Sequence, residues 1–320
     1  MGILDHILVP LDGSRLAECV LPHAATIARA FEAQITLLHV VTDTERSTTS
    51  PSLDPLRWHI SKAESQAYLD EIAARLRAIG LQVEVIILEG KAAERIIDFA
   101  RNKENDLLIL SSHGQSGLSG WNISSVVQKI LMRAYASIMI VRAYHPSKED
   151  LTSLCYHKLL VPLDCSKRAE CALPMALKLA NCEDATLMVT HIVQRPEIPC
   201  YEMLSQEDNA LLEKVVKRSK EISTAYLEEL CSYYPEKMHS HLSVSDTPHI
   251  TLQNLVEQEA IDLVILSAHG YSGSVRWPYG SLVTSFIAYG TSPLLIVQDI
   301  SPDKIQLTQA EIAAKEQKGH

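Results

Sequence analysis

Two glycine-rich stretches contain the residue types that bind a phosphate group. They read SSHGQSGLSGWNISSV at 111–126 and SAHGYSGSVRWPYGSLV at 267–283, each between a short apolar run and a helical pattern. Backbone N–H groups converge where such a loop enters a helix, and the helix dipole favours negative charge there. Glycine lets the backbone approach phosphate oxygens because it has no Cβ. Both stretches therefore indicate anion-binding loops.

An aspartate ends an apolar run near the start of each half of the chain. The surrounding sequences are VPLDGSRLAECVLP at 9–22 and VPLDCSKRAECALP at 161–174, which share ten of fourteen positions. Repetition at a fixed offset of 152 residues indicates a duplicated domain. The run is typical of a strand buried on both faces, so Asp12 and Asp164 are expected at the carboxyl edge of a parallel sheet, where ligands bind. Alternatively, the two aspartates only cap the helices that follow them.

Strand and helix patterns alternate five times in each half, which predicts an α/β fold of two tandem doubly wound, Rossmann-like domains, each with a five-stranded parallel sheet. The expected strands are 6–12, 34–41, 82–88, 106–112 and 137–142, then 158–164, 185–193, 238–244, 262–268 and 293–298. The expected helices are 14–30, 61–79, 92–102 and 124–133, then 166–179, 207–233, 249–258 and 281–288. Pro22 and Pro174 predict a kink or a two-part first helix. The domains are expected at 1–143 and 157–300, with a linker at 144–156 and a tail at 301–320.

Composition narrows the function classes. The formal net charge is −10, and neither half has the basic surface that nucleic acid demands, so nucleic-acid binding is not expected. No apolar run reaches the ~18–20 residues that span a bilayer, and the acidic surface argues against anionic membranes. Seven cysteines without a CxxC pair fit reduced thiols, so we expect a cytoplasmic protein in which Cys19 and Cys171 pack in the core.

Both halves resemble the universal stress protein family, whose fold is Rossmann-like and nucleotide α-hydrolase-like. Its ATP-binding members carry G-x2-G-x9-G-[ST] after the fourth strand. The second half departs from this motif only at the first position, and the first half departs at the first and third positions. The matched residues are Ser267, Gly270, Gly280 and Ser281 in the second half and Ser111, Gly114, Ser124 and Ser125 in the first.

The resemblance implies ATP or a related adenine nucleotide as ligand, more strongly in the second half, and leaves Mg²⁺ open as its companion ion. In the family, the first-strand aspartate and a second-strand residue contact adenine, while the glycine loop holds ribose and phosphates. The implied nucleotide-binding residues are Asp12, Val40, Gly114, Ser124 and Ser125, and Asp164, Ile192, Gly270, Gly280, Ser281 and Leu282. The family's single-domain members pair through their fifth strands, so we expect 137–142 and 293–298 to pair as an intramolecular pseudo-dimer; a homodimer stays open.

Other functions remain to be weighed. Another branch of the family lacks the glycines and uses no nucleotide, which leaves a ligand-free module for a protein partner as the alternative, and a weak ATPase as a further one. The first strands are not followed by the SGGxDS loop of ATP pyrophosphatases. His113 and His269 have no carboxylate nearby in sequence, so we expect them to pack in the structure or to form hydrogen bonds within the loop. We therefore do not expect this protein to be an enzyme. Trp121 and Trp277 share a repeat position, and they either pack the loop on its own domain or contact a ligand or a partner chain. Arg276 either reaches a phosphate or lies in solvent.

Overall fold

The computed structural model describes residues 3–42, 55–102, 106–115, 117, 123–143, 150–196, 205–271 and 278–299. The strands are β1 (His6–Pro10), β2 (Gln34–Val41), β3 (Val83–Glu89), β4 (Leu107–Ser111), β5 (Ser137–Val141), β6 (Lys158–Pro162), β7 (Thr186–Gln194), β8 (Met238–Ser245), β9 (Leu263–Ser267) and β10 (Leu294–Val297). The α-helices are α1 (Val20–Phe31), α2 (Pro55–Ala78), α3 (Ala92–Asn102), α4 (Ser125–Arg133), α5 (Leu173–Glu183), α6 (Gln206–Ser232), α7 (Pro248–Gln258) and α8 (Ser281–Tyr289). Each predicted strand and helix is present, with bounds shifted by a few residues.

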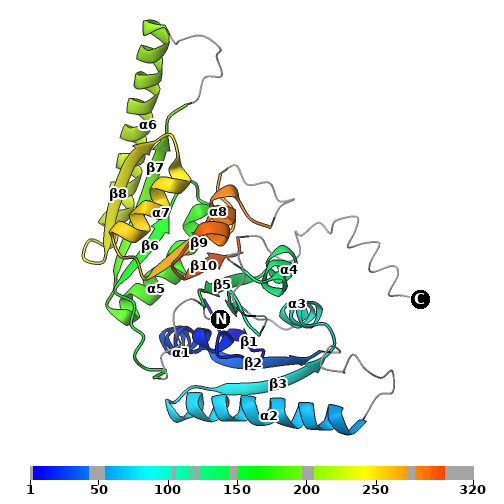
Figure 1. Cartoon of the computed structure of the whole chain (residues 1–320). Helices are drawn as coiled ribbons and strands as arrows, with labels where there is room; N and C mark the ends of the chain where they lie inside the picture. Colours follow the sequence, from blue (N-terminus) through cyan, green and yellow to red (C-terminus); the bar gives the residue numbers. More distant parts are fainter. Residues whose placement is uncertain are drawn as a thin grey trace.

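The strands form one sheet of ten in the order β3-β2-β1-β4-β5-β10-β9-β6-β7-β8. Within each half the pairing is parallel and the order is that of a doubly wound domain, which confirms the predicted fold class. The halves join where β5 and β10 pair antiparallel, with Met139 opposite Leu295. Figure 1 shows this junction between the first half, drawn below, and the second, drawn above. The expected pseudo-dimer through the fifth strands is therefore confirmed.

Both faces of the sheet carry a core that continues across the junction. One apolar cluster combines residues of α1, α2, α5 and α6 with one face of the strands. The other combines residues of α3, α4, α7 and α8 with the opposite face. The joining strands, with the sequences SIMIV and LLIV, are almost entirely buried. Successive side chains of a strand point to opposite faces of the sheet, so each strand contributes to both clusters. Pairing also satisfies the N–H and C=O groups that either edge strand would otherwise expose.

A short 3₁₀ helix precedes the first α-helix of each half, at Ala17–Cys19 (η1) and Ala169–Ala172 (η3). Pro22 follows in the first turn of α1, and Pro174 in the first turn of α5. Proline is tolerated there because the first-turn N–H groups have no intrahelical acceptor. The predicted two-part helix is confirmed in both halves.

Arg142, which follows β5, is buried beneath the second half, with 2% of its surface exposed. Its Nη2 donates to the carbonyl oxygen of Phe286 at 2.8 Å and to that of Ile287 at 3.4 Å. These carbonyls belong to the last turn of α8, where a positive charge interacts favourably with the helix dipole. The first half thus supplies the C-terminal cap of a helix in the second half.

The end of the predicted linker belongs to the core. Tyr156 is fully buried, and its hydroxyl lies 2.6 Å from Nδ1 of His23 on α1. Thr26, also on α1, donates from Oγ1 to the carbonyl oxygen of Leu154 at 3.1 Å. The backbone N–H of Tyr156 donates to the carboxylate of Glu183, the last residue of α5. This segment therefore connects the first helices of the two halves.

Replacing the buried arginine should weaken the whole protein. Arg142→Met removes charge-assisted hydrogen bonds to α8, so we expect the free energy of unfolding to fall by about 1.5–3 kcal/mol in urea titrations. Arg101→Met is the matched control, because the exposed Arg101 also donates to a carbonyl at a helix end, that of Arg133. The control should cost under about 1 kcal/mol, since solvent replaces its bond. Equal losses in the two variants would contradict this account.

Burial lowers the pKa of His23 from 6.5 to about 4. The folded state then binds fewer protons than the unfolded state between these pH values, so stability falls as pH drops from about 6.5 towards 4. A difference of about 2.5 pKa units corresponds to about 3 kcal/mol. Unfolding titrations at pH 7.5 and 4.5 should show a smaller acid loss in His23→Gln than in the wild type. An unchanged loss would show that His23 does not titrate in this way.

Candidate functional site

Each half contains a pocket at the carboxyl ends of its strands, near the point where strand order reverses. The volumes are about 320 Å³ in the first half and about 260 Å³ in the second. All of the sequence-predicted residues line these pockets. They are Asp12, Val40, Gly114, Ser124 and Ser125 in the first pocket, and Asp164, Ile192, Gly270, Gly280, Ser281 and Leu282 in the second. In each half the structure therefore brings the predicted residues at the strand ends together with those of the glycine loop.

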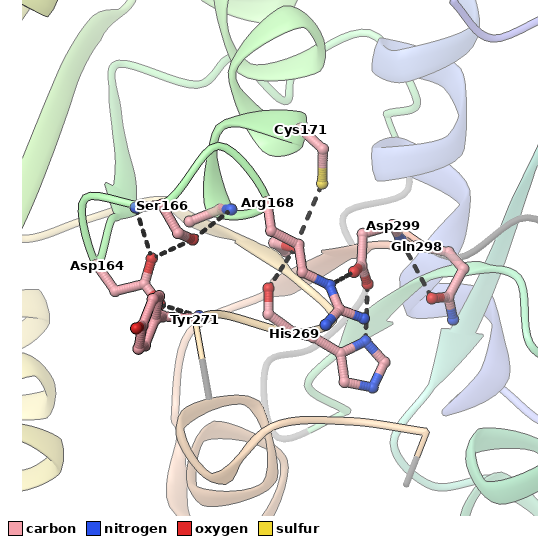
Figure 2. A network of polar contacts seen from close by, with 10 residues as sticks. Asp164, Ser166, Arg168, Cys171, His269, Tyr271, Gln298 and Asp299 are labelled. Carbon is pink, nitrogen blue, oxygen red and sulfur yellow. Dashed lines mark hydrogen bonds and ion pairs between the residues drawn. The ribbon is translucent and has the colours of Figure 1, made fainter. Parts of the chain in front are cut away.

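The two aspartates tie the loop after the first strand of each half to the glycine loop. Asp164 accepts bonds at Oδ1 from the N–H of Ser166 at 3.1 Å and from its hydroxyl at 2.6 Å. Its Oδ2 accepts from the N–H of Tyr271 at 2.5 Å, as Figure 2 shows. Asp12 makes the same contacts with Ser14 and Gln115. Three of roughly four acceptor positions on each carboxylate are thus engaged within the protein.

The second motif glycine of each loop is required by the protein itself. A Cβ at Gly114 would overlap Oδ2 of Asp12 and lie 3.0 Å from its Cγ. A Cβ at Gly270 would overlap Oδ2 of Asp164 and lie 3.2 Å from its Cγ. These glycines therefore allow the aspartate to reach the loop, whether or not a ligand is bound.

The two halves differ at the start of the helix that follows the loop. Ser124 is the N-cap of α4, and its Oγ accepts from the N–H of Val127 at 3.3 Å. Gly280 is the N-cap of α8 and supplies no side-chain bond. A Cβ at Gly280 would meet no atom closer than 3.7 Å, so the protein does not require glycine there. The second pocket thus presents a helix N-terminus whose first-turn N–H groups lack a side-chain cap.

The first motif position holds serine in both halves, and the serine hydroxyl forms hydrogen bonds within each half. Ser111 donates from Oγ to the carbonyl oxygen of His113 at 2.6 Å and accepts from the thiol of Cys19 at 3.4 Å. Ser267 and Cys171 make the same contacts in the second half. Burial raises the pKa of Cys19 to about 11, so its thiol stays protonated. The expected core role of Cys19 agrees with this environment.

The histidines of the second strands, buried His39 and half-buried His191, each have a hydrogen-bond partner. Nδ1 of His39 lies 2.8 Å from the carbonyl oxygen of Leu11, and Nδ1 of His191 lies 2.7 Å from that of Leu163. Both bonds require the proton on Nδ1, because a carbonyl oxygen can only accept. Each histidine joins its second strand to the end of the first.

His269 has a carboxylate partner that sequence reasoning missed. Its Nδ1 lies 2.7 Å from Oδ1 of Asp299, which follows β10, and Arg168 forms an ion pair with Oδ2. Figure 2 shows the three side chains together. Burial opposes ionisation of Asp299, but the bonds from His269 and Arg168 outweigh it and hold its pKa below the usual value.

A register comparison of the two halves could have revealed this network. The positions corresponding to Arg168 and Asp299 hold Leu16 and Ala143 in the first half, so both charges occur only in the second. His113 instead has its Nδ1 3.2 Å from the hydroxyl of Ser112. The expectation of loop bonding holds for His113, but it was incomplete for His269.

Some predicted features lie beyond this description. Trp121, Trp277 and Arg276 lie outside the described residues. Within the described ranges, no group of three His, Cys, Asp or Glu side chains could hold a metal ion. No helix in the described part of the chain is long and apolar enough to cross a membrane.

Comparisons with known proteins match one family to each half of the chain. The family model described as the universal stress protein family matches residues 4–142 and 156–298. A universal stress protein of Methanocaldococcus jannaschii is 28% identical over 150 residues, which are 46% of this chain and 86% of that protein. A universal stress protein of Mycobacterium tuberculosis is 22% identical over 305 residues, which are 91% of this chain and 96% of that protein.

Among solved structures, a universal stress protein of Archaeoglobus fulgidus has a TM-score of 0.62 to this chain. The alignment has 20% sequence identity and covers 92% of this chain and 98% of that one. At this identity the likeness concerns the fold, and the fold extends over both halves.

The contact between Asp164 and Gly270 yields a test by double mutation. Gly270→Ala should force the carboxylate away from its loop bonds and cost about 1–3 kcal/mol of unfolding free energy. In an Asp164→Ala background the same change should cost little, because the overlapping atoms are gone. Gly280→Ser is the control and should cost under about 0.5 kcal/mol, since serine is a good N-cap. Additive costs in urea titrations would contradict the steric explanation.

Proposed function

The chain belongs to the universal stress protein family, with one domain of that family in each half, and we propose that it binds ATP or a related adenine nucleotide in the pocket of its second half. The role is that of a binding and regulatory module in a stress response. One observation carries the proposal: the N-terminus of α8 opens into this pocket without a side-chain cap, at a glycine where a Cβ would clash with none of the described residues.

The chemistry of the second pocket suits the two parts of a nucleotide. Backbone N–H groups at the start of α8, together with the hydroxyl of Ser281, can donate to phosphate oxygens, and the helix dipole favours their charge. Ile192, Leu252 and Leu266 supply apolar surface for a base. Asp164 retains an acceptor position beyond its three loop bonds, which an adenine amino group or a ribose hydroxyl could use.

Mg²⁺ would accompany the nucleotide through its phosphates. The described residues supply no cluster of carboxylates for the ion, and Mg²⁺ commonly keeps several waters while it binds phosphate oxygens. The protein would then hold the ion through the nucleotide, so we expect nucleotide binding to persist, with lower affinity, when Mg²⁺ is removed.

We propose binding without efficient turnover because three acidic or basic side chains beside the phosphate loop already have structural partners. Asp164 holds the glycine loop, His191 bonds the carbonyl oxygen of Leu163, and His269 bonds Asp299. A general base needs a position within reach of an attacking water and freedom to take its proton. Slow hydrolysis remains compatible with this arrangement.

The first pocket should bind nucleotide more weakly. The hydroxyl of Ser124 already accepts from an N–H in the first turn of α4, so fewer donors face the pocket. Ser124 also places a Cβ and hydroxyl where the second half has only Gly280.

Exchange at the helix N-cap tests the ranking of the two pockets. Gly280→Val should lower ATP affinity at least about 10-fold, because its branched side chain fills space at the helix N-terminus. Ser124→Gly should increase binding by the first half. The measurement is isothermal titration calorimetry, with melting temperature and circular dichroism confirming that each variant is folded. Equal ATP affinity in the wild type and in Gly280→Val would overturn the assignment.

A further inference from the structure

Thr190, on β7, has a hydroxyl group that the protein leaves without a partner. The residue is fully buried and lines the second pocket. Its side chain lies on the same face of the strand as those of Met188 and Ile192, since residues two apart share a face. Among the described residues, no atom forms a hydrogen bond with its Oγ1.

His249, at the start of α7, repeats this feature in the same pocket. Its Nδ1 is buried and has no hydrogen-bond partner among the described residues. Thr190 and His249 come from neighbouring elements, because α7 packs against β7. Two residues that each have a buried polar atom without a partner among the described residues therefore line one cavity.

The first half has only hydrocarbon at the corresponding positions. Leu38 precedes His39 as Thr190 precedes His191, and it lines the first pocket. Ala93 is the second residue of α3 as His249 is the second residue of α7. Leu38 and Ala93 both belong to the apolar cluster on that face. The second half thus has polar side chains where the repeated fold needs none.

Buried polar groups without partners destabilise a protein, so a pair of them in one pocket needs an explanation. A ligand with complementary polar atoms supplies one, because its binding satisfies both groups at once. Thr190 can donate and accept, and Nδ1 of His249 can do either, depending on its tautomer. An apolar ligand would leave both groups unsatisfied.

The position of these groups indicates which part of the ligand they contact. The order β9-β6-β7 separates the loop before α8 from β7 by two strand spacings, or about 10 Å. A nucleotide with its phosphates at the N-terminus of α8 can place its base at that distance, over β7. Ile192 and Leu252 lie beside this region as apolar contacts for the ring.

We propose that Thr190 and His249 are the base-selecting residues of the second pocket, where they hydrogen-bond the polar edge of a purine base. This inference rests on the proposed nucleotide binding and adds the group that is recognised. The corresponding residues of the first half, Leu38 and Ala93, have no polar side-chain atom that could hydrogen-bond a base.

The first experiment concerns stability without ligand. Thr190→Val keeps the shape of the side chain and removes an unpartnered hydroxyl, so the melting temperature of the ligand-free protein should stay the same or rise. Thr26→Val is the matched control: its buried hydroxyl donates to the carbonyl oxygen of Leu154, and its loss should lower the melting temperature. A Thr190→Val variant that melts as early as Thr26→Val would overturn the proposal, because the hydroxyl would then have a structural partner.

The second experiment compares ATP with benzimidazole riboside triphosphate, which keeps the purine shape and the phosphates but lacks N1, N3 and the amino group. Wild-type protein should prefer ATP in calorimetry. Thr190→Val and His249→Ala should each reduce that preference about 3- to 10-fold, the value of one hydrogen bond. Thr26→Val should leave it unchanged.

The outcomes separate this inference from the proposed function. If both ligands bind wild-type protein equally, or if the preference survives in Thr190→Val and His249→Ala, base selection by these residues is wrong while nucleotide binding stands. If neither ligand binds and Gly280→Val behaves as the wild type, the proposed function is wrong and the inference falls with it. A reduced preference in both variants, with Thr26→Val unchanged, supports it.

Discussion

The antiparallel pairing of β5 with β10 is the constraint on which the structure depends. It converts two parallel sheets into one of ten strands, so neither fifth strand keeps an exposed edge. It also lets both apolar clusters continue from one half to the other. Arg142 could be buried only at such a junction, because its charge needs the carbonyls at the end of α8. The two halves therefore fold as parts of one core, while each keeps its own pocket.

Within this shared frame the duplicated loops have kept one set of contacts and changed another. The bonds from aspartate to the loops recur in both halves, as do the serine–cysteine pairs beneath them. The changes concentrate in the second half, where charges surround His269 and polar side chains replace Leu38 and Ala93. The second pocket therefore has polar side chains at two positions where the first half has hydrocarbon.

Glycine is present at two positions of the same motif for different physical reasons. Gly270 leaves room for the carboxylate of Asp164, so it would be needed in a ligand-free member of the family as well. A Cβ at Gly280 would make only ordinary van der Waals contacts, at 3.7 Å or more among the described residues, and the glycine leaves the start of α8 without a side-chain cap. Of these two glycines, only Gly280 distinguishes a loop that can bind an anion from a loop that is folded but has no anion site. The motif as a sequence pattern does not separate these two roles.

The amino-acid sequence by itself determined the duplication, the order of strands and helices, the two-part first helices and the edge at which the predicted site residues meet. These follow from local signals: apolar periodicity sets which face of an element is buried, and proline and glycine set where elements begin and end. Only the tertiary structure decided that Asp299 pairs with His269, that Arg142 caps α8, and that the hydroxyl of Thr190 has no partner among the described residues. Such partners are far apart in the chain, and periodicity gives a side chain's face but not the atoms that packing places opposite it.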